Sequence, residues 1–131
     1  MPTVKLSLLS DVYGIARLAP DAPYPAWASG EGFTSLSRTT TELSVVCRDQ
    51  LIPSQVRADR QWRCIQLVGP FAFDQTGIVL SVIRPLSEAG VGIFVISTYD
   101  GDVVLVKALD LPRSKALLTS AGHRWIDEDQ V

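Results

Sequence analysis

Two apolar segments joined by a short polar turn dominate the second half of this chain and limit the folds that it can adopt. Val91 to Ile96 and Val103 to Val106 have the composition of strands, and the residues between them, Ser97 to Asp102, are small or polar. Gly90 precedes the pair and is suited to end a helix, because glycine accepts the left-handed conformation that closes one. The pattern predicts a helix followed by a buried β-hairpin, with hydroxyl groups, a glycine and a carboxylate exposed at the hairpin tip.

The residues before this hairpin predict a strand and then a helix. Trp62 to Val68 alternates in part between apolar and polar residues, as a half-buried strand does. Asp74 is the expected N-cap of the helix, because its carboxylate can accept hydrogen bonds from the first-turn amides. Four apolar residues then share one helix face: Ile78, Val82, Leu86 and Ala89.

A second helix and a last strand are expected after the hairpin. Asp110 and Pro112 are suited to begin the helix, Gly122 is suited to end it, and His123 to Ile126 has the composition of a strand. The order is then strand, helix, strand, strand, helix, strand. This order predicts an α+β fold with the ferredoxin-like βαββαβ topology.

The first half gives weaker patterns and contains prolines that exclude a long helix between residues 10 and 31. Its strand candidates are Val4 to Leu9, Tyr13 to Leu18, Phe33 to Arg38 and Leu43 to Cys47, and residues 49 to 61 are expected to be a linker. Ser37 and Glu42 match Ser97 and Asp102 at an offset of 60 residues. We therefore expect two related units in one continuous sheet, a shortened unit over residues 1–58 and a complete unit over residues 59–131.

The run GIFVISTYDGDVVLV, within Glu88 to Val106, resembles the second strand pair of an ACT domain, a small regulatory module that binds amino acids. It is most similar to the ACT-like units of aspartate kinases and of the cytosolic arginine sensors of the CASTOR type. The resemblance covers roughly Trp62 to Asp127. A weaker similarity to stand-alone two-unit ACT proteins extends to the segment GFTSLSRTTTELSVVC in the first half.

The resemblance implies that the hairpin tip contacts a ligand. In the CASTOR-type sensors the equivalent hairpin supplies ligand contacts, which implies contact roles for Gly92, Thr98, Tyr99 and Asp102. Ser97 adds a second hydroxyl. An amino acid needs donors for its carboxylate and an acceptor for its ammonium, and Asp102 can be that acceptor. The opposite wall of the pocket is expected from the loop Gly69 to Phe73 or from Ser10 to Tyr13.

Other function classes find little support in the sequence. We expect no catalytic residue, no metal site and no cofactor, because His123 lacks a partner at a suitable spacing, Cys47 and Cys64 form no C-x-x-C pair, and phosphate-binding glycine motifs are absent. The net charge of −2 without a basic cluster argues against nucleic acid, and the absence of a long apolar run argues against a membrane. Both cysteines lie in apolar patterns and are expected to be buried free thiols, and a cytoplasmic location follows by default.

The expected function is therefore a non-catalytic sensor that binds an amino acid at an interface of ACT units, as a homodimer that can regulate a partner enzyme. Two alternatives remain open. A ligand-free protein–protein adaptor or dimerisation module would have the hairpin tip packed shut. A small hydrolase or isomerase would use Asp102 as a base. An ordinary structural turn would also account for the polar residues, since such residues close hairpins.

Overall fold

The computed structural model describes residues 2–72 and 74–127, and the contacts within it divide the chain into two compact units. Met1–Leu9 and Arg63–Val131 form one unit, which we call the discontinuous unit, and Ser10–Trp62 form the inserted unit. Strand β5 (Ala58–Leu67) passes from the inserted unit into the discontinuous one. The first strand of the chain therefore belongs with the second half of the sequence.

In its described residues, the discontinuous unit has five strands in the order β8, β1, β5, β7, β6. Besides β5 these are β1 (Lys5–Leu8), β6 (Ile93–Ser97), β7 (Asp102–Lys107) and β8 (Arg124–Ile126). β1 runs antiparallel to β5, with Leu6 opposite Leu67, and parallel to β8, with Leu6 opposite Trp125. β6 and β7 form the expected hairpin, in which Ser97 lies opposite Asp102.

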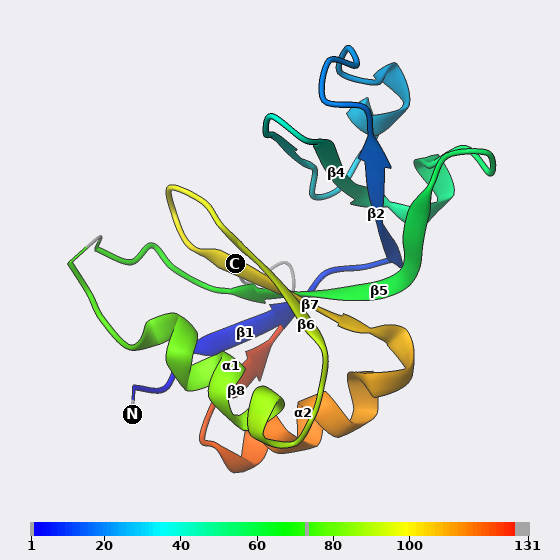
Figure 1. Cartoon of the computed structure of the whole chain (residues 1–131). Helices are drawn as coiled ribbons and strands as arrows, with labels where there is room; N and C mark the ends of the chain where they lie inside the picture. The colour runs from blue at the N-terminus through cyan, green and yellow to red at the C-terminus, as the bar shows by residue number, and fades with distance from the viewer. Residues whose placement is uncertain (1, 73, 128–131) are drawn as a thin grey trace. The chain divides into compact units, whose positions relative to one another are not determined.

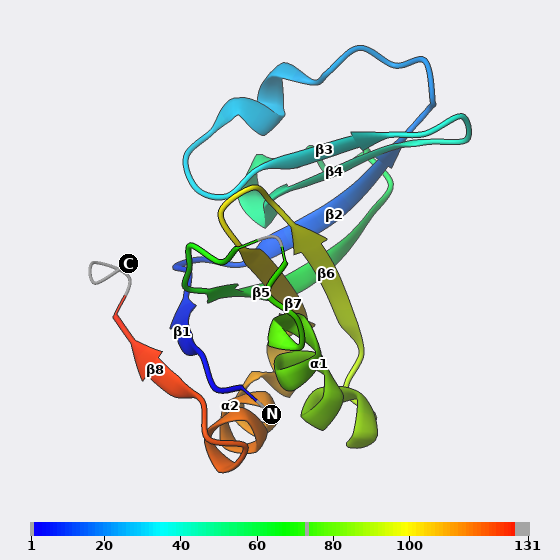
Figure 2. The ribbon, with the colours of Figure 1, turned by 90° about the vertical axis from the view of Figure 1, so that its left-hand side faces the viewer.

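Two helices cover one face of this sheet, α1 (Ile78–Glu88) and α2 (Leu111–Ser120), with the short 3₁₀ turn η3 (Ala108–Asp110) before α2. Figures 1 and 2 show both helices on the same side of β1, β5 and β7. The core between the layers includes Leu6, Ile65, Val82, Leu86, Val104 and Leu118, all fully buried. The order β5, α1, β6, β7, α2, β8 confirms the predicted α+β, ferredoxin-like topology, to which β1 adds a strand between β5 and β8.

The predicted N-cap of α1 is wrong. The helix begins at Ile78, and the capping position is held by Gly77 with φ of 80° and no side-chain cap. Asp74 lies in the loop before it and is exposed. Gly77 ends the loop because a positive φ is a conformation that glycine adopts without strain, and this moves the capping position three residues beyond Asp74.

The inserted unit is an antiparallel sheet in the order β3, β4, β2, β5. Its own strands are β2 (Tyr13–Leu18), β3 (Ser35–Arg38) and β4 (Leu43–Arg48), and its 3₁₀ turns are η1 (Ala26–Ser29) and η2 (Asp49–Leu51). A small core is built from Ala16, Ala28, Leu43, Val45, Cys47 and Ile52. The expected linker over residues 49–61 is wrong at its end, because β5 already begins at Ala58 and pairs there with β2.

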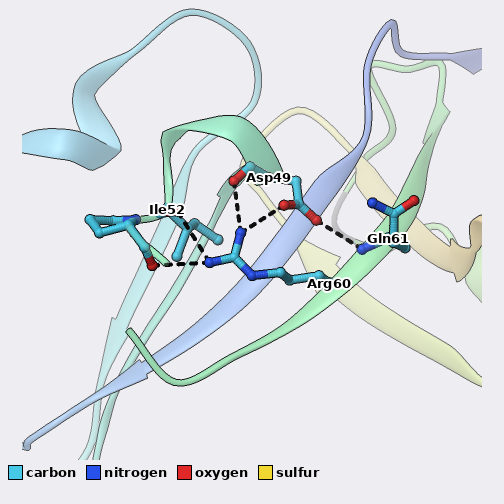
Figure 3. A network of polar contacts seen from close by, with 5 residues as sticks. Asp49, Ile52, Arg60 and Gln61 are labelled. Carbon is cyan, nitrogen blue, oxygen red and sulfur yellow. Dashed lines mark hydrogen bonds and ion pairs between the residues drawn. The ribbon is translucent and has the colours of Figure 1, made fainter. Parts of the chain in front are cut away.

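A polar network fastens the turn after β4 to the start of β5 (Figure 3). The Arg60 guanidinium donates to Asp49 Oδ1 at 2.7 Å and to the carbonyl oxygens of Asp49, Ile52 and Pro53 at 3.0–3.1 Å. The other carboxylate oxygen of Asp49 accepts from the Gln61 backbone N–H at 2.9 Å. Arg60 thereby adds a donor to three carbonyl groups of the turn, two of which, those of Asp49 and Pro53, also accept from the backbone N–H groups of Ile52 and Val56.

The hairpins of the two units share the same turn. Thr98 N–H donates to the Gly101 carbonyl and Gly101 N–H to Thr98 Oγ1; Thr39 and Glu42 make the same two bonds in the inserted unit. The structural offset is therefore 59 residues (98 − 39 and 101 − 42), not 60. At this offset Asp102 corresponds to Leu43, and the expected match to Glu42 is wrong.

Candidate ligand pocket

A pocket of about 330 Å³ opens between the hairpin tip and the start of α1, and every residue that lines it belongs to the discontinuous unit. The hairpin contributes Ser97, Thr98, Tyr99, Gly101 and Asp102. The loop after β5 contributes Phe71, Ala72 and Gln75, and the start of α1 contributes Gly77, Ile78, Val79 and Leu80. The volume lies at the lower end of the range for small-molecule sites.

Hydrogen bonds within the hairpin hold its tip in place. Thr98 N–H donates to the Gly101 carbonyl at 2.7 Å, and Thr98 Oγ1 donates to the same carbonyl at 3.0 Å. Ser97 Oγ donates to Asp102 Oδ1 in a short bond. Ser97 thus orients the Asp102 carboxylate through Oδ1, and the second carboxylate oxygen receives no bond from Ser97.

The hairpin tip packs closely on the end of β5. A Cβ atom on Gly69 would collide with the carbonyl oxygen of Asp100, and one on Gly101 would lie 3.1 Å from the carbonyl oxygen of Leu67. The two glycines therefore let two backbone segments approach closely. This approach brings Phe71 and Ala72 to the same pocket as Thr98 and Asp102.

The start of α1 offers the pocket uncapped backbone amides. The first intrahelical bond is donated by Ser81 N–H to the Gly77 carbonyl at 3.0 Å, so the amides of Ile78, Val79 and Leu80 have no partner within the helix. No side chain caps this end, and no acidic residue lies in the first turn. Such an end carries partial positive charge and favours an anionic group.

Four of the five predicted contact residues come together here. Ser97, Thr98, Tyr99 and Asp102 line the pocket, whereas Gly92 precedes β6 at the end of the strand opposite the tip and does not line it. A Cβ on Gly92 would have no atom within 4 Å, so no crowding requires glycine there. The opposite wall was expected from the loop Gly69 to Phe73 or from Ser10 to Tyr13. Phe71 and Ala72 of the first loop line the pocket, and Phe73 lies outside the described residues.

The residues that sequence reasoning missed are those of the helix start, Gly77 to Leu80, together with Gln75. Their omission follows from the misplaced N-cap, because a helix beginning at Asp74 would bring other residues to this position. The glycine at 77, just before a run of apolar residues, is the sequence feature that could have indicated the start.

The described residues show neither a metal-binding cluster nor a membrane-spanning helix. Within residues 2–72 and 74–127, no group of three or more His, Cys, Asp or Glu side chains is placed to hold a metal ion. None of the helices in this part of the chain is long and apolar enough to cross a membrane. Cys47 and Cys64 are buried thiols that form no disulfide, which confirms the expectation for both.

Comparison with protein families gives an ACT domain at residues 57–120, and a separate N-terminal domain model matches residues 11–55. The human protein CASTOR3P is 32% identical over 93 residues, a match that covers 61% of this chain and 57% of the human protein. The chain thus spans little more than half the length of this relative.

Two solved structures show how widely the fold is shared. Protein Atu0741 from Agrobacterium tumefaciens is 54% identical, with a TM-score of 0.92 over 98% of this chain and 96% of that one. The regulatory subunit of aspartate kinase from Thermus thermophilus is 10% identical, with a TM-score of 0.64 over 92% of this chain and 99% of that one. At that identity the second likeness concerns the fold alone.

Proposed function

Residues 57–120 belong to the ACT domain family, and we propose that this chain is a non-catalytic regulatory protein that binds a free amino acid in the pocket at the hairpin tip. The observation that carries the proposal is the pairing of opposite chemistries in one pocket. The residues of the uncapped start of α1 and Asp102 both line it.

Each charged group of an amino acid finds a complementary group in this pocket. The carboxylate is placed at the start of α1, where the amides of Ile78 to Leu80 donate to it and the helix dipole favours its charge. The ammonium is placed at Asp102, whose carboxylate is already oriented by Ser97. Thr98 and Tyr99 complete the wall. Gly92 lies outside the lining, and its role as a ligand contact stays a prediction.

A ligand-free adaptor is the competing function, and it predicts a hairpin tip that is packed shut. The open pocket lined by Thr98 and Asp102 favours ligand binding over that alternative. A hydrolase or isomerase that uses Asp102 as base gains no support, because the polar groups around it, Ser97 and Thr98, are already bonded within the hairpin.

The remaining parts of the proposal concern assembly and location. Among the residues that the structure describes, β6 pairs only with β7, which leaves its other edge available to a second ACT unit. We expect a homodimer in which the ligand stabilises the interface, a cytoplasmic location, and a regulated enzyme as partner. Binding would shift these equilibria by mass action.

Thermal unfolding of the purified protein against the twenty amino acids tests the proposal. A ligand present at about 100 times its Kd should stabilise the folded state by about 2.7 kcal/mol, which is a shift of several degrees. Asp102→Asn should abolish the shift. Glu42→Gln is the matched control, because it removes the same charge from the equivalent turn of the inserted unit.

Light scattering on the same samples measures the mass of the protein. Together with the unfolding data, the mass separates the sensor from the ligand-free adaptor. A ligand-dependent shift, with or without a change of mass, supports the sensor. A flat panel together with a constant dimer mass would contradict it and favour the adaptor.

A further inference from the structure

The residues that line the pocket also indicate which amino acids fit it. This inference rests on the proposed function. Among the described residues that line it, Asp102 alone carries a full charge at neutral pH; the set contains no Lys, Arg, His or Glu. The polar groups left are hydroxyls and the Gln75 amide. The pocket therefore offers one anion and no side-chain cation.

The rest of the lining is apolar. Phe71 of the loop and Ile78, Val79 and Leu80 of the helix line the pocket and make up its apolar wall, and Tyr99 of the hairpin lines the pocket as well. Leu80 is 48% exposed and Tyr99 is 80% exposed. Two of the six large hydrophobic side chains that are exposed in the described part of the chain thus lie on this pocket, and an apolar group placed there would remove their surface from water.

We infer that the pocket takes an amino acid with an uncharged, apolar side chain, and rejects amino acids with acidic or basic ones. An acidic side chain would need a cation that the lining lacks. A basic side chain would need a second carboxylate, because Asp102 is occupied by the ammonium of the ligand. A charged side chain against this wall would lose its hydration without gaining a partner.

L-Norleucine and L-lysine test the inference directly, because they share a four-carbon stem and differ in the terminal ammonium. Titration calorimetry on the intact protein should show norleucine binding at least about tenfold more tightly than lysine, since the ammonium of lysine would be desolvated unpaired. L-Glutamate should bind no better than lysine. Lysine or glutamate binding as tightly as norleucine would overturn the inference and leave the proposed function intact.

A variant of the wall provides a second, positive test. Leu80→Glu adds a carboxylate to the mouth of the pocket and should reverse the preference, so that lysine binds more tightly than norleucine. Leu109→Glu is the matched control, because Leu109 is 95% exposed in the same unit and does not line the pocket. An unchanged preference in Leu80→Glu would contradict the assignment of this wall. Failure of every amino acid to bind would overturn the proposed function itself and the inference with it.

Discussion

Cys47 lies fully buried in β4, and its surroundings keep the thiol neutral. Burial, assisted by the negative charge of Asp49 and opposed by the positive charge of Arg60, raises the pKa of the Cys47 thiol from 9.0 to about 11. The thiolate is the reactive form of cysteine, so Cys47 is an inert core residue at neutral pH.

This shift predicts both a reactivity and a pH dependence. In the native protein at pH 8, a thiol reagent should modify neither Cys47 nor the equally buried Cys64, and unfolding should release both. Because the folded-state pKa is raised, the stabilisation from Cys47 is complete below pH 9 and is lost as pH rises from 9 to about 11, where the unfolded chain alone releases the proton. Urea unfolding across this range measures the loss, which Cys47→Ala should reduce. Rapid native labelling at pH 8 would contradict the assignment.

The Arg60 side chain connects the turn after β4 to the start of β5, so its removal should weaken this corner. Arg60→Met keeps the length of the side chain but removes the charged donor from Asp49 Oδ1 and from the carbonyls of Asp49, Ile52 and Pro53, of which those of Asp49 and Pro53 keep a backbone donor. We expect a loss of about 1–3 kcal/mol in the free energy of unfolding, as for a partly buried charged network that loses one partner.

Arg57→Met is the control for that experiment, because Arg57 is exposed and has the same side chain. Chemical denaturation measures both variants, and hydrogen exchange should place the loss of protection at η2 and the start of β5. Equal stabilities of the two variants would show that the network contributes nothing.

The elements differ in how far the sequence determines them. The hairpin of β6 and β7 was predicted because its apolar runs and polar tip are local patterns. The start of α1 was misplaced because Asp74 is a good N-cap by composition, whereas the backbone conformation of Gly77 decides the matter. β5 is longer than predicted because its first residues are polar and owe their strand conformation to pairing with β2.

Of the candidate site, the hairpin side was predicted and the helix side was not. The hairpin residues Ser97 to Asp102 carry their chemistry in their own side chains, so the sequence and the family resemblance both indicate them. The helix side of the pocket consists of backbone amides and apolar side chains, which have no distinctive sequence pattern. The offset of 59 residues between the two turns also escaped detection, because it depends on hydrogen bonds and not on residue identity.

At the scale of the whole molecule, His123 joins parts of the discontinuous unit that lie far apart in sequence. Val4 N–H donates to its Nδ1 at 3.1 Å, and its Nε2 lies 2.8 Å from the Ser81 carbonyl of α1. Since Nδ1 accepts, the proton is on Nε2, which donates to Ser81. His123 is 4% exposed. Its two hydrogen bonds connect the start of the chain to α1, the helix whose start lines the pocket.

Removal of this ring should weaken the entire unit. His123→Ala leaves a buried N–H and a buried carbonyl unpaired and opens a cavity, so we expect a loss of about 2–4 kcal/mol in the free energy of unfolding. Denaturant melts followed by fluorescence and circular dichroism measure it. Arg124→Ala, an exposed neighbour, is the control. A loss below about 0.5 kcal/mol, the range of ordinary surface substitutions, would contradict this role.

The position of β1 between β5 and β8 has a consequence for synthesis on the ribosome. β1 emerges early, yet its partners are the second half of β5 and the last described strand, β8. The inserted unit, Ser10–Trp62, is complete long before β8 has been translated. Folding during translation would therefore proceed from the middle of the sequence, and the nascent first strand would have to remain unpaired or be protected until β5 has emerged, and its β8-facing edge until β8 has emerged.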